Sequence, residues 1–427
     1  MFGPGMLVAL LLLLVVSVAA RLDALFFLAV ALLVAAGLSR IWERYCLSRI
    51  EYRRWFSRHE AEFGDTVEVR IEIVNRKPLP LSWLEVEDEM SEALRPAHGW
   101  VHASYRPHRA VLASLIALRP YERVRRLYQF PCEIRGEHTF GPVSLRSGDL
   151  FGFATREEQR DLSESLVVYP RVLPVVTPDL PARHPLGDLR VRSWLFEDVT
   201  RIAGARDYRP GDGLRRIHWP ATVRTQRLQS KVLESTTSHV IALLLNLVTD
   251  DDQGWGVRFD PEVVEMSIVA TASLAAWALD RGYQVGLSTN GTHRMSWRNV
   301  GVPPARDPNQ LHRLLLALGK LQPFALGRFD EMVRREARDL PFGSTIVAVT
   351  SGVGANLAAA LMSLRARGHS ITVVLTGRDA GVPRIPGVRL LTIRPPESWR
   401  TSDALVLQPA VLAGSRDPQP IVAEASR

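Results

Sequence analysis

Cysteine, recognisable catalytic motifs and metal-ligand spacings are scarce or missing in this chain of 427 residues. Its two cysteines, Cys46 and Cys132, are too few for a disulfide framework or a thiolate metal site. The sequence has no nucleophile elbow, zinc motif or P-loop lysine, and Gly352–Gly354 lacks the rest of a dinucleotide fingerprint. These absences argue against the common hydrolase, zinc-enzyme and nucleotide-binding classes, and we expect no cofactor.

Basic residues exceed acidic ones, with 53 Lys and Arg against 45 Asp and Glu and a formal net charge of +8. Much of the excess lies between Arg40 and Arg58 and between Arg190 and Lys231. The first cluster borders an apolar segment, which explains arginines more simply than nucleic acid does. The second is interleaved with Asp207 and Asp212. We therefore expect no nucleic-acid partner.

Two apolar runs near the N-terminus predict a helical hairpin in a lipid bilayer. Gly3 to Ala20 is uncharged, Arg21–Asp23 interrupts the pattern, and Ala24 to Leu38 is apolar again. Each run is close to the roughly 17 residues that the shortest spanning helices need. A cleaved signal peptide ending near Ala20 is the alternative, but a basic n-region is missing and the second run follows directly.

The distribution of arginine predicts the orientation of this hairpin. Its turn carries only Arg21, which Asp23 offsets, whereas six arginines follow the second run. The positive-inside rule then predicts a multi-pass protein of the cell membrane with both termini and all later residues in the cytoplasm. The six residues are Arg40, Arg44, Arg49, Arg53, Arg54 and Arg58.

Residues 46–178 predict a β-rich domain. Thr66 to Val74 alternates apolar and polar residues, as a half-buried strand does, and Asn75 to Pro80 has turn composition. Several short strands without a long helix favour an immunoglobulin-like sandwich. Further strands are expected at 82–87, 110–117, 122–131, 136–143 and 165–168.

From residue 236 to residue 395 the pattern becomes α/β. His239 to Val248 is a continuous apolar run, typical of a buried parallel strand. Asp260 and Pro261 are expected to cap and open a helix, while Asn290–Gly291 predicts a hairpin turn with His293 to Arg298 pairing back. Strands expected at 283–289, 344–350, 370–376 and 388–393 alternate with helices around 311–318 and 355–367. This alternation predicts a doubly wound sheet, followed by a partly disordered tail at 396–427.

Between these domains, residues 190–235 concentrate charge around a forced turn. Pro210 and Gly211 carry a type II turn signature, and Asp212 can cap a short helix. Pro220 suits the first turn of a second short helix. We expect the ring of Trp219 to be buried between the β-rich and α/β domains.

The same segment resembles the signature of the DUF58 family. The matching positions are Arg206, Tyr208, Gly211, Asp212, Arg215, Ile217, Trp219, Arg224, Thr225 and Glu234. Upstream matches are Arg135–Gly136, Gly141–Val143, Asp149–Gly152 and Val168–Arg171. The resemblance implies a transmembrane hairpin at 1–45, the β-rich domain, the signature and a von Willebrand A-like α/β domain.

The resemblance also implies a non-enzymatic, membrane-anchored interaction or assembly protein that works with a MoxR-type AAA+ ATPase. The signature would dock this partner or brace the two domains, and both possibilities stay open. The candidate residues are Arg206, Asp207, Tyr208, Gly211, Asp212, Arg215, Arg216, Trp219 and Arg224. The alternative function is a membrane-bound hydrolase that uses the arginine and aspartate cluster.

A von Willebrand A-like fold often holds Mg²⁺ through acidic and hydroxyl side chains at its loop tips, which suit a hard cation. Here the first loop offers Asn246 and Asp250 without hydroxyls at the required spacing, and Ser351 occupies the position of a later Asp. These three residues are a degenerate site, so we expect no bound metal.

Overall fold

The computed structural model divides the chain into two compact units, Met1–Arg171 with Leu318–Lys320, and Val172–Ala317 with Leu321–Arg427. It describes residues 4–149, 155–176, 202–207, 217–233, 240–249, 259–294, 296, 298–336, 338–378, 385–393 and 395–410.

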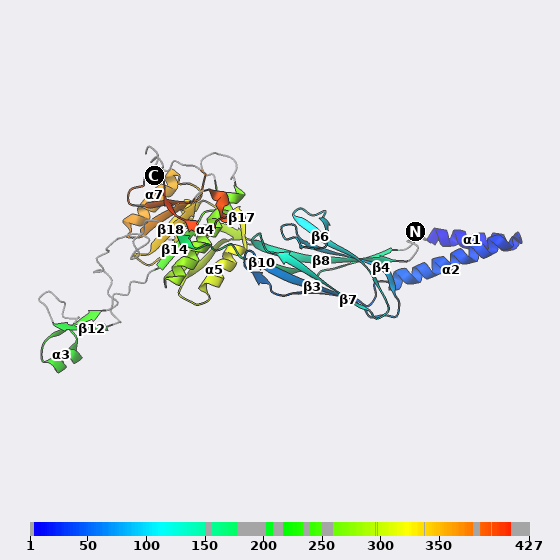
Figure 1. Cartoon of the computed structure of the whole chain (residues 1–427), viewed down its shortest axis with the longest axis horizontal. Helices are drawn as coiled ribbons and strands as arrows, with labels where there is room; N and C mark the ends of the chain where they lie inside the picture. The colour runs from blue at the N-terminus through cyan, green and yellow to red at the C-terminus, as the bar shows by residue number, and fades with distance from the viewer. Residues whose placement is uncertain are drawn as a thin grey trace, which may run out of the picture. The chain divides into compact units, whose positions relative to one another are not determined.

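The first unit begins with two apolar helices, α1 (Pro4–Ala19) and α2 (Asp23–Tyr45), which lie side by side (Figure 1). By length and composition α2 can cross a membrane, and the part of α1 from Val8 to Ala19 is a shorter apolar helix. Most large apolar side chains of the pair are exposed, including Phe27 and Leu38. Helix α4 (Pro261–Asp280) of the second unit is also long and apolar enough to cross a membrane, but 72% of its apolar window is buried, as in the core helix of a globular domain.

Two sheets that are mostly antiparallel follow and pack over one core. One has three strands in the order β1-β3-β7; the other has the order β2-β10-β8-β4-β6-β5, with β9 on β8. Inward side chains from both sheets, such as Ile71, Phe130, Leu84 and Phe140, belong to a single buried cluster. The unit is therefore a β-sandwich. Its strands are β1 (Ile50–Phe56), β2 (Glu60–Ala61), β3 (Thr66–Asn75), β4 (Leu81–Ser91), β5 (Trp100–Ala103), β6 (Arg109–Leu118), β7 (Arg123–Pro131), β8 (Gly136–Gly148), β9 (Thr155–Arg160) and β10 (Glu164–Val168).

The strands expected in this region are confirmed. In β3, burial alternates from Thr66 to Ile71, and every residue after Ile71 is buried. The apolar pattern did not predict strands β1 and β9, because charged residues interrupt β1 and make up most of β9. In β1 the inward positions are Ile50, Tyr52 and Arg54, so a buried arginine occupies a position that alternation reserves for an apolar side chain. Arg54 is thus part of the core and not a cation at the membrane border. Cys46 and Cys132 are free and buried.

The second unit contains an eight-stranded sheet in the order β16-β15-β14-β18-β19-β20-β22, with β17 on β15. Pairing is parallel from β15 through β14, β18 and β19 to β20, and antiparallel for β16, β17 and β22. The strands are β14 (Val240–Leu245), β15 (Gln284–His293), β16 (Asn299–Ala305), β17 (Leu321–Ala325), β18 (Thr345–Thr350), β19 (Ser370–Leu375), β20 (Arg389–Thr392) and β22 (Gln408–Pro409).

Helices cover this sheet, as the doubly wound prediction requires. After β14 the chain moves to β15 on one side, and after β18 it moves to β19 on the other side of the sheet. Because such crossovers are right-handed, α4 and α7 lie on opposite faces of the sheet. On the α7 face, α6 and α7 share one cluster with Leu244, Ile346 and Val373. Asp260 caps α4 as expected, accepting the N–H groups of Glu262 and Val263. The helices are α4 (Pro261–Asp280), α5 (Gln310–Gly319), α6 (Phe329–Glu336) and α7 (Ala355–Ala366).

The predicted turn at Asn290–Gly291 is wrong, and so is the strand at 293–298. Strand β15 continues through both residues to His293 and pairs with β16, which begins at Asn299. Asn290 is fully buried and accepts the N–H of Leu247. A Cβ at Gly291 would lie 2.5 Å from Leu247 Cδ1. Internal packing, and not a turn, therefore accounts for this Asn–Gly pair.

Residues 396–410 also have structure. They form a 3₁₀ helix, Pro396–Arg400, and two short strands, β21 (Leu405–Val406) and β22. Strand β21 pairs with β11 (Val175–Val176), and β22 extends the main sheet. The α/β unit therefore continues past residue 395.

Candidate functional site

The signature segment contributes a small strand–helix–strand element. Strand β12 (Ile202–Asp207) pairs antiparallel with β13 (Gln229–Leu233), and α3 (Trp219–Thr225) precedes β13. Pro220 lies in the first turn of α3, so the predicted second short helix is confirmed. His218 caps this helix, since its Nδ1 accepts the N–H of Ala221 at 3.0 Å. We call residues 202–207 with 217–233 the signature hairpin.

Several hydrogen bonds fasten α3 to the strands. The Gln229 N–H donates to Thr222 Oγ1 at 3.0 Å, and the His218 N–H donates to the Gln229 carbonyl at 2.8 Å. Gln229 Nε2 donates to Asp207 Oδ1 at 2.6 Å, which links β13 to β12. Ile217 is buried and bridges Ser230. The hairpin thus holds its helix in one orientation.

Trp219 is 63% exposed, so the prediction of a buried ring is wrong. None of the seven residues of α3 is buried. Val223 lies one helical turn after Trp219 and is 72% exposed. Ile217 fills the inward position next to Ser230, which leaves Trp219 to begin the helix on the outer side. An exposed aromatic residue, an exposed valine and the exposed Arg224 therefore share this helix.

The other signature candidates are only partly described. Asp207 is exposed at the end of β12, and the backbone of Arg206 pairs with Ser230. The remaining candidates lie outside the described residues; they are Tyr208, Gly211, Asp212, Arg215 and Arg216. The structure therefore brings Asp207 together with Gln229 and presents Trp219 and Arg224 on α3.

A neutral polar network occupies the carboxyl edge of the parallel sheet, where the degenerate metal positions fall. Asn246 Nδ2 donates to Thr350 Oγ1 at 3.1 Å, and Asn246 Oδ1 accepts Asn290 Nδ2 at 2.8 Å and the Val248 N–H at 3.0 Å. Ser351 Oγ donates to the Val248 carbonyl at 3.1 Å.

Hard cations prefer several carboxylate or carbonyl oxygens that remain available for coordination. The amide oxygen of Asn246 already accepts two N–H groups, so this residue does not fit a divalent cation. Asp250 lies outside the described residues. Within the described parts of the chain, no three His, Cys, Asp or Glu side chains gather as a ligand set.

The sequence reasoning missed a buried ion pair in the sandwich. Both oxygens of Asp88 lie 2.7 Å from Arg54 Nη1, and Tyr52 Oη donates to Asp88 Oδ2 at 2.7 Å. The Arg54 guanidinium lies over the rings of Phe56 and Phe140 and donates to the Leu162 carbonyl. Burial raises the pKa of the Asp88 carboxyl, and Arg54 opposes that rise. The sequence signal for this pair was the spacing of Tyr52 and Arg54, which fall at the same inward-facing positions of β1 as Ile50.

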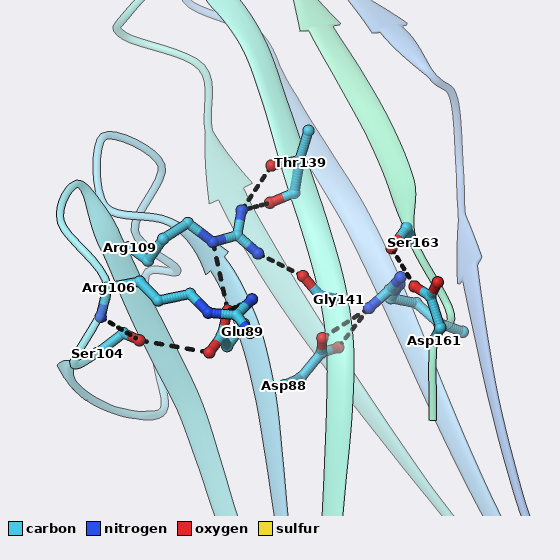
Figure 2. Close-up of polar contacts among 10 residues, drawn as sticks. Asp88, Glu89, Ser104, Arg106, Arg109, Thr139, Gly141, Asp161 and Ser163 are labelled. Carbon is cyan, nitrogen blue, oxygen red and sulfur yellow. Dashed lines mark hydrogen bonds and ion pairs between the residues drawn. The ribbon is translucent and has the colours of Figure 1, made fainter. Parts of the chain in front are cut away.

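A second polar cluster surrounds Glu89 in the sheet that contains β4. Arg106 Nη1 lies 3.2 Å from Glu89 Oε2, and Arg109 Nε lies 3.6 Å from the same oxygen. Arg109 also donates to the Thr139 carbonyl at 2.8 Å and to the Gly141 carbonyl (Figure 2). The cluster connects β4, β6 and β8, so its role in the fold is to brace one sheet.

These elements define a multidomain chain with an apolar helical pair, a β-sandwich and a mainly parallel α/β sheet. Residues 204–403 match the family model described as "Protein of unknown function DUF58". The match begins in β12 and includes the signature hairpin and the described sheet up to β20. The family that the signature motif resembles is thus the one whose model matches this part of the chain.

One curated relative is the "Uncharacterized protein YeaD" of Bacillus subtilis (strain 168), 23% identical over 272 residues. The match covers 63% of this chain and 62% of that relative, so the chain spans less than two thirds of the relative's length.

Similar solved structures include the CARDB domain of a Pyrococcus furiosus protein, at 7% identity and a TM-score of 0.19, covering 28% of this chain and 86% of that one. A cohesin module from a Clostridium perfringens glycoside hydrolase is 10% identical, with a TM-score of 0.19, covering 27% and 96%. These scores carry no functional argument.

Proposed function

We propose that this chain is a non-enzymatic, membrane-anchored assembly partner that docks another protein through its signature hairpin. The observation that carries the proposal is the exposed surface of α3. Trp219 and Val223 are both mostly exposed on a helix that hydrogen bonds hold in place. Tryptophan and arginine are the residues most enriched at the energetic centres of protein interfaces, and Arg224 is exposed on the same helix.

The partner that we infer is a MoxR-type AAA+ ATPase, on the resemblance of the signature to the DUF58 family. An ATPase partner would supply the energy that this chain has no recognisable motif to supply.

The remaining parts of the proposal concern architecture and location. Five parallel strands with an antiparallel strand β16 after the second support a von Willebrand A-like fold for the α/β unit. Two sheets over one core support an immunoglobulin-like sandwich. The exposed apolar surface of α1 and α2 supports insertion into the cell membrane as a hairpin, and the arginines after Leu38 favour a cytoplasmic location for both units.

The docking proposal is tested with the detergent-purified full chain and the MoxR-type ATPase from the same organism, by biolayer interferometry. We expect Trp219→Ala with Val223→Ala to weaken binding at least tenfold while the thermal unfolding temperature stays unchanged. The matched control, Phe324→Ala with Met362→Ala, removes two exposed apolar side chains elsewhere in the same unit and should bind like wild type. Equal affinity for all three proteins would refute docking by α3.

A further inference from the structure

The last turns of α2 are held against the sandwich. Ser39 Oγ donates to Asp149 Oδ2 at 2.7 Å, and both residues are buried. Farther along the helix, Arg156 Nη1 donates to the Arg44 carbonyl at 2.9 Å. Cys46, which follows the helix, is fully buried. The end of the sandwich next to α2 therefore has a fixed place beside the helix.

A buried lysine fastens the loop after β3 to the exit of the same helix. Lys77 Nζ donates to the Ser48 carbonyl at 2.9 Å and to the Cys46 carbonyl. Burial lowers the pKa of Lys77 to about 8. The Arg76 N–H also donates to the Arg49 carbonyl at 3.0 Å. The loop and the helix exit thus form one rigid junction.

The loop between β6 and β7 joins this junction. Asn75 Nδ2 donates to the carbonyls of Leu79 and Arg119, both at 2.9 Å. The Tyr121 N–H donates to the Lys77 carbonyl at 3.4 Å. Segments far apart in the sequence therefore make one continuous surface around the end of α2.

This surface carries exposed arginines and tyrosines, which we call the basic collar: Arg44, Arg49, Arg119, Tyr45 and Tyr121. Tyr121 is 68% exposed. None of the ion pairs found among the described residues uses Arg44, Arg49 or Arg119. Their positive charges are therefore available to an external anion.

The collar begins at the outer edge of the lipid headgroup layer if α2 spans a bilayer. The apolar run ends at Leu38, and Arg44 is six residues farther along the helix. At 1.5 Å per residue this is about 9 Å. The headgroup layer is about 5–8 Å thick on each side of the hydrocarbon. Tyrosine rings also favour this interface.

We propose that the basic collar binds the anionic headgroups of membrane phospholipids and so seats the sandwich on the bilayer. The inference rests on the proposed membrane insertion of α1 and α2. Arginines close to an anionic leaflet gain electrostatic attraction that a zwitterionic leaflet does not provide. The exit of α2 and the two loops beside it are fixed in place before binding, so little ordering is required of them.

The test uses native mass spectrometry of the full chain in detergent, titrated with phosphatidylglycerol or phosphatidylcholine. Wild type should retain phosphatidylglycerol in preference to phosphatidylcholine. Replacing Arg44, Arg49 and Arg119 by Gln should reduce that preference about 10- to 100-fold. The matched control replaces Arg58, Arg95 and Arg106 by Gln, three exposed arginines at the opposite ends of the strands, and should keep the preference.

Two further measurements separate the possible failures. Inorganic phosphate at millimolar concentration should not displace the lipid; displacement would mean that the collar binds free phosphate and would overturn the lipid assignment. Carbonate extraction of membranes reports insertion directly. A chain that carbonate releases would contradict both insertion and the collar, whereas a retained chain without headgroup preference would contradict the collar alone.

Discussion

The two units bury polar side chains in different ways. In the sandwich, Arg54 and Asp88 form a charged pair that joins β1 of one sheet to β4 of the other. In the α/β unit, Asn246, Asn290 and Thr350 form a neutral network that joins the ends of β14, β15 and β18. A buried charge without its partner costs far more than a lost neutral hydrogen bond. The sandwich should therefore be the unit that depends more strongly on individual polar residues.

The largest effect is expected from Arg54→Met. The substitution leaves the Asp88 carboxylate buried with only neutral donors, so the free energy of unfolding of the sandwich should fall by about 3–5 kcal/mol. Hydrogen exchange of the amides of β4 and β8 in the full chain measures this unit alone. The control, Arg70→Met, changes an exposed arginine in the neighbouring strand β3 and should cost less than about 0.5 kcal/mol.

The double variant Arg54→Met with Asp88→Leu sharpens the same point. Removing both charges takes away the buried unpaired carboxylate, so the double variant should be more stable than Arg54→Met alone. If the stability losses of Arg54→Met and of Asp88→Leu alone instead added up to the loss of the double variant, the two residues would not be interacting through charge. In that case the contrast between the two units would fail.

A smaller loss is expected from Asn246→Ala. The substitution leaves Asn290 Nδ2 and the Val248 N–H without their acceptor, which should cost about 1–3 kcal/mol. Hydrogen exchange of β14 and β18 amides gives the value. Asn356→Ala removes an exposed asparagine from α7 and serves as the control. A loss as large as that of Arg54→Met would contradict the distinction between charged and neutral networks.

His138 offers a pH-dependent test within the sandwich. Its ring lies close to the Ile134 carbonyl and Ser91 Oγ, and burial lowers the pKa of the imidazole. Below about pH 6.5 the unfolded chain takes up a proton that the folded chain resists, so this residue makes stability fall on acidification. The stability gap between wild type and His138→Gln should therefore narrow from pH 7 to pH 5. A constant gap would contradict this, and His98→Gln is the exposed control.

The smallest effect on stability is expected from Trp219→Ala. A fully buried tryptophan would cost about 3–5 kcal/mol when truncated, but this ring is mostly exposed. The free energy of unfolding of the second unit should change by less than about 0.5 kcal/mol. A loss above 2 kcal/mol, on the order expected for a core aromatic, would show that the ring is a structural brace.

Local patterns predicted the elements of this fold well where burial follows periodicity. Strand β3 alternates through Ile71, β14 is continuously apolar, and Asp260 caps α4 as the Asp260–Pro261 pair predicts. The pattern failed at β1, where Arg54 takes an apolar position because its charge is neutralised by a residue 34 positions away. It also failed at Asn290–Gly291, whose local turn preference yields to hydrogen bonds and close packing inside β15.

The candidate site shows the same division. Its hairpin helix follows from Pro220 and was predicted, whereas the exposure of Trp219 depends on which neighbours the tertiary structure supplies. The sequence by itself determined the apolar helices, most strands, the cap of α4 and the family resemblance, because each depends on residues close together in the chain. Only the tertiary structure decided which polar residues are buried and paired and which apolar residues are exposed. Burial and pairing depend on contacts between distant segments, and local periodicity does not contain that information.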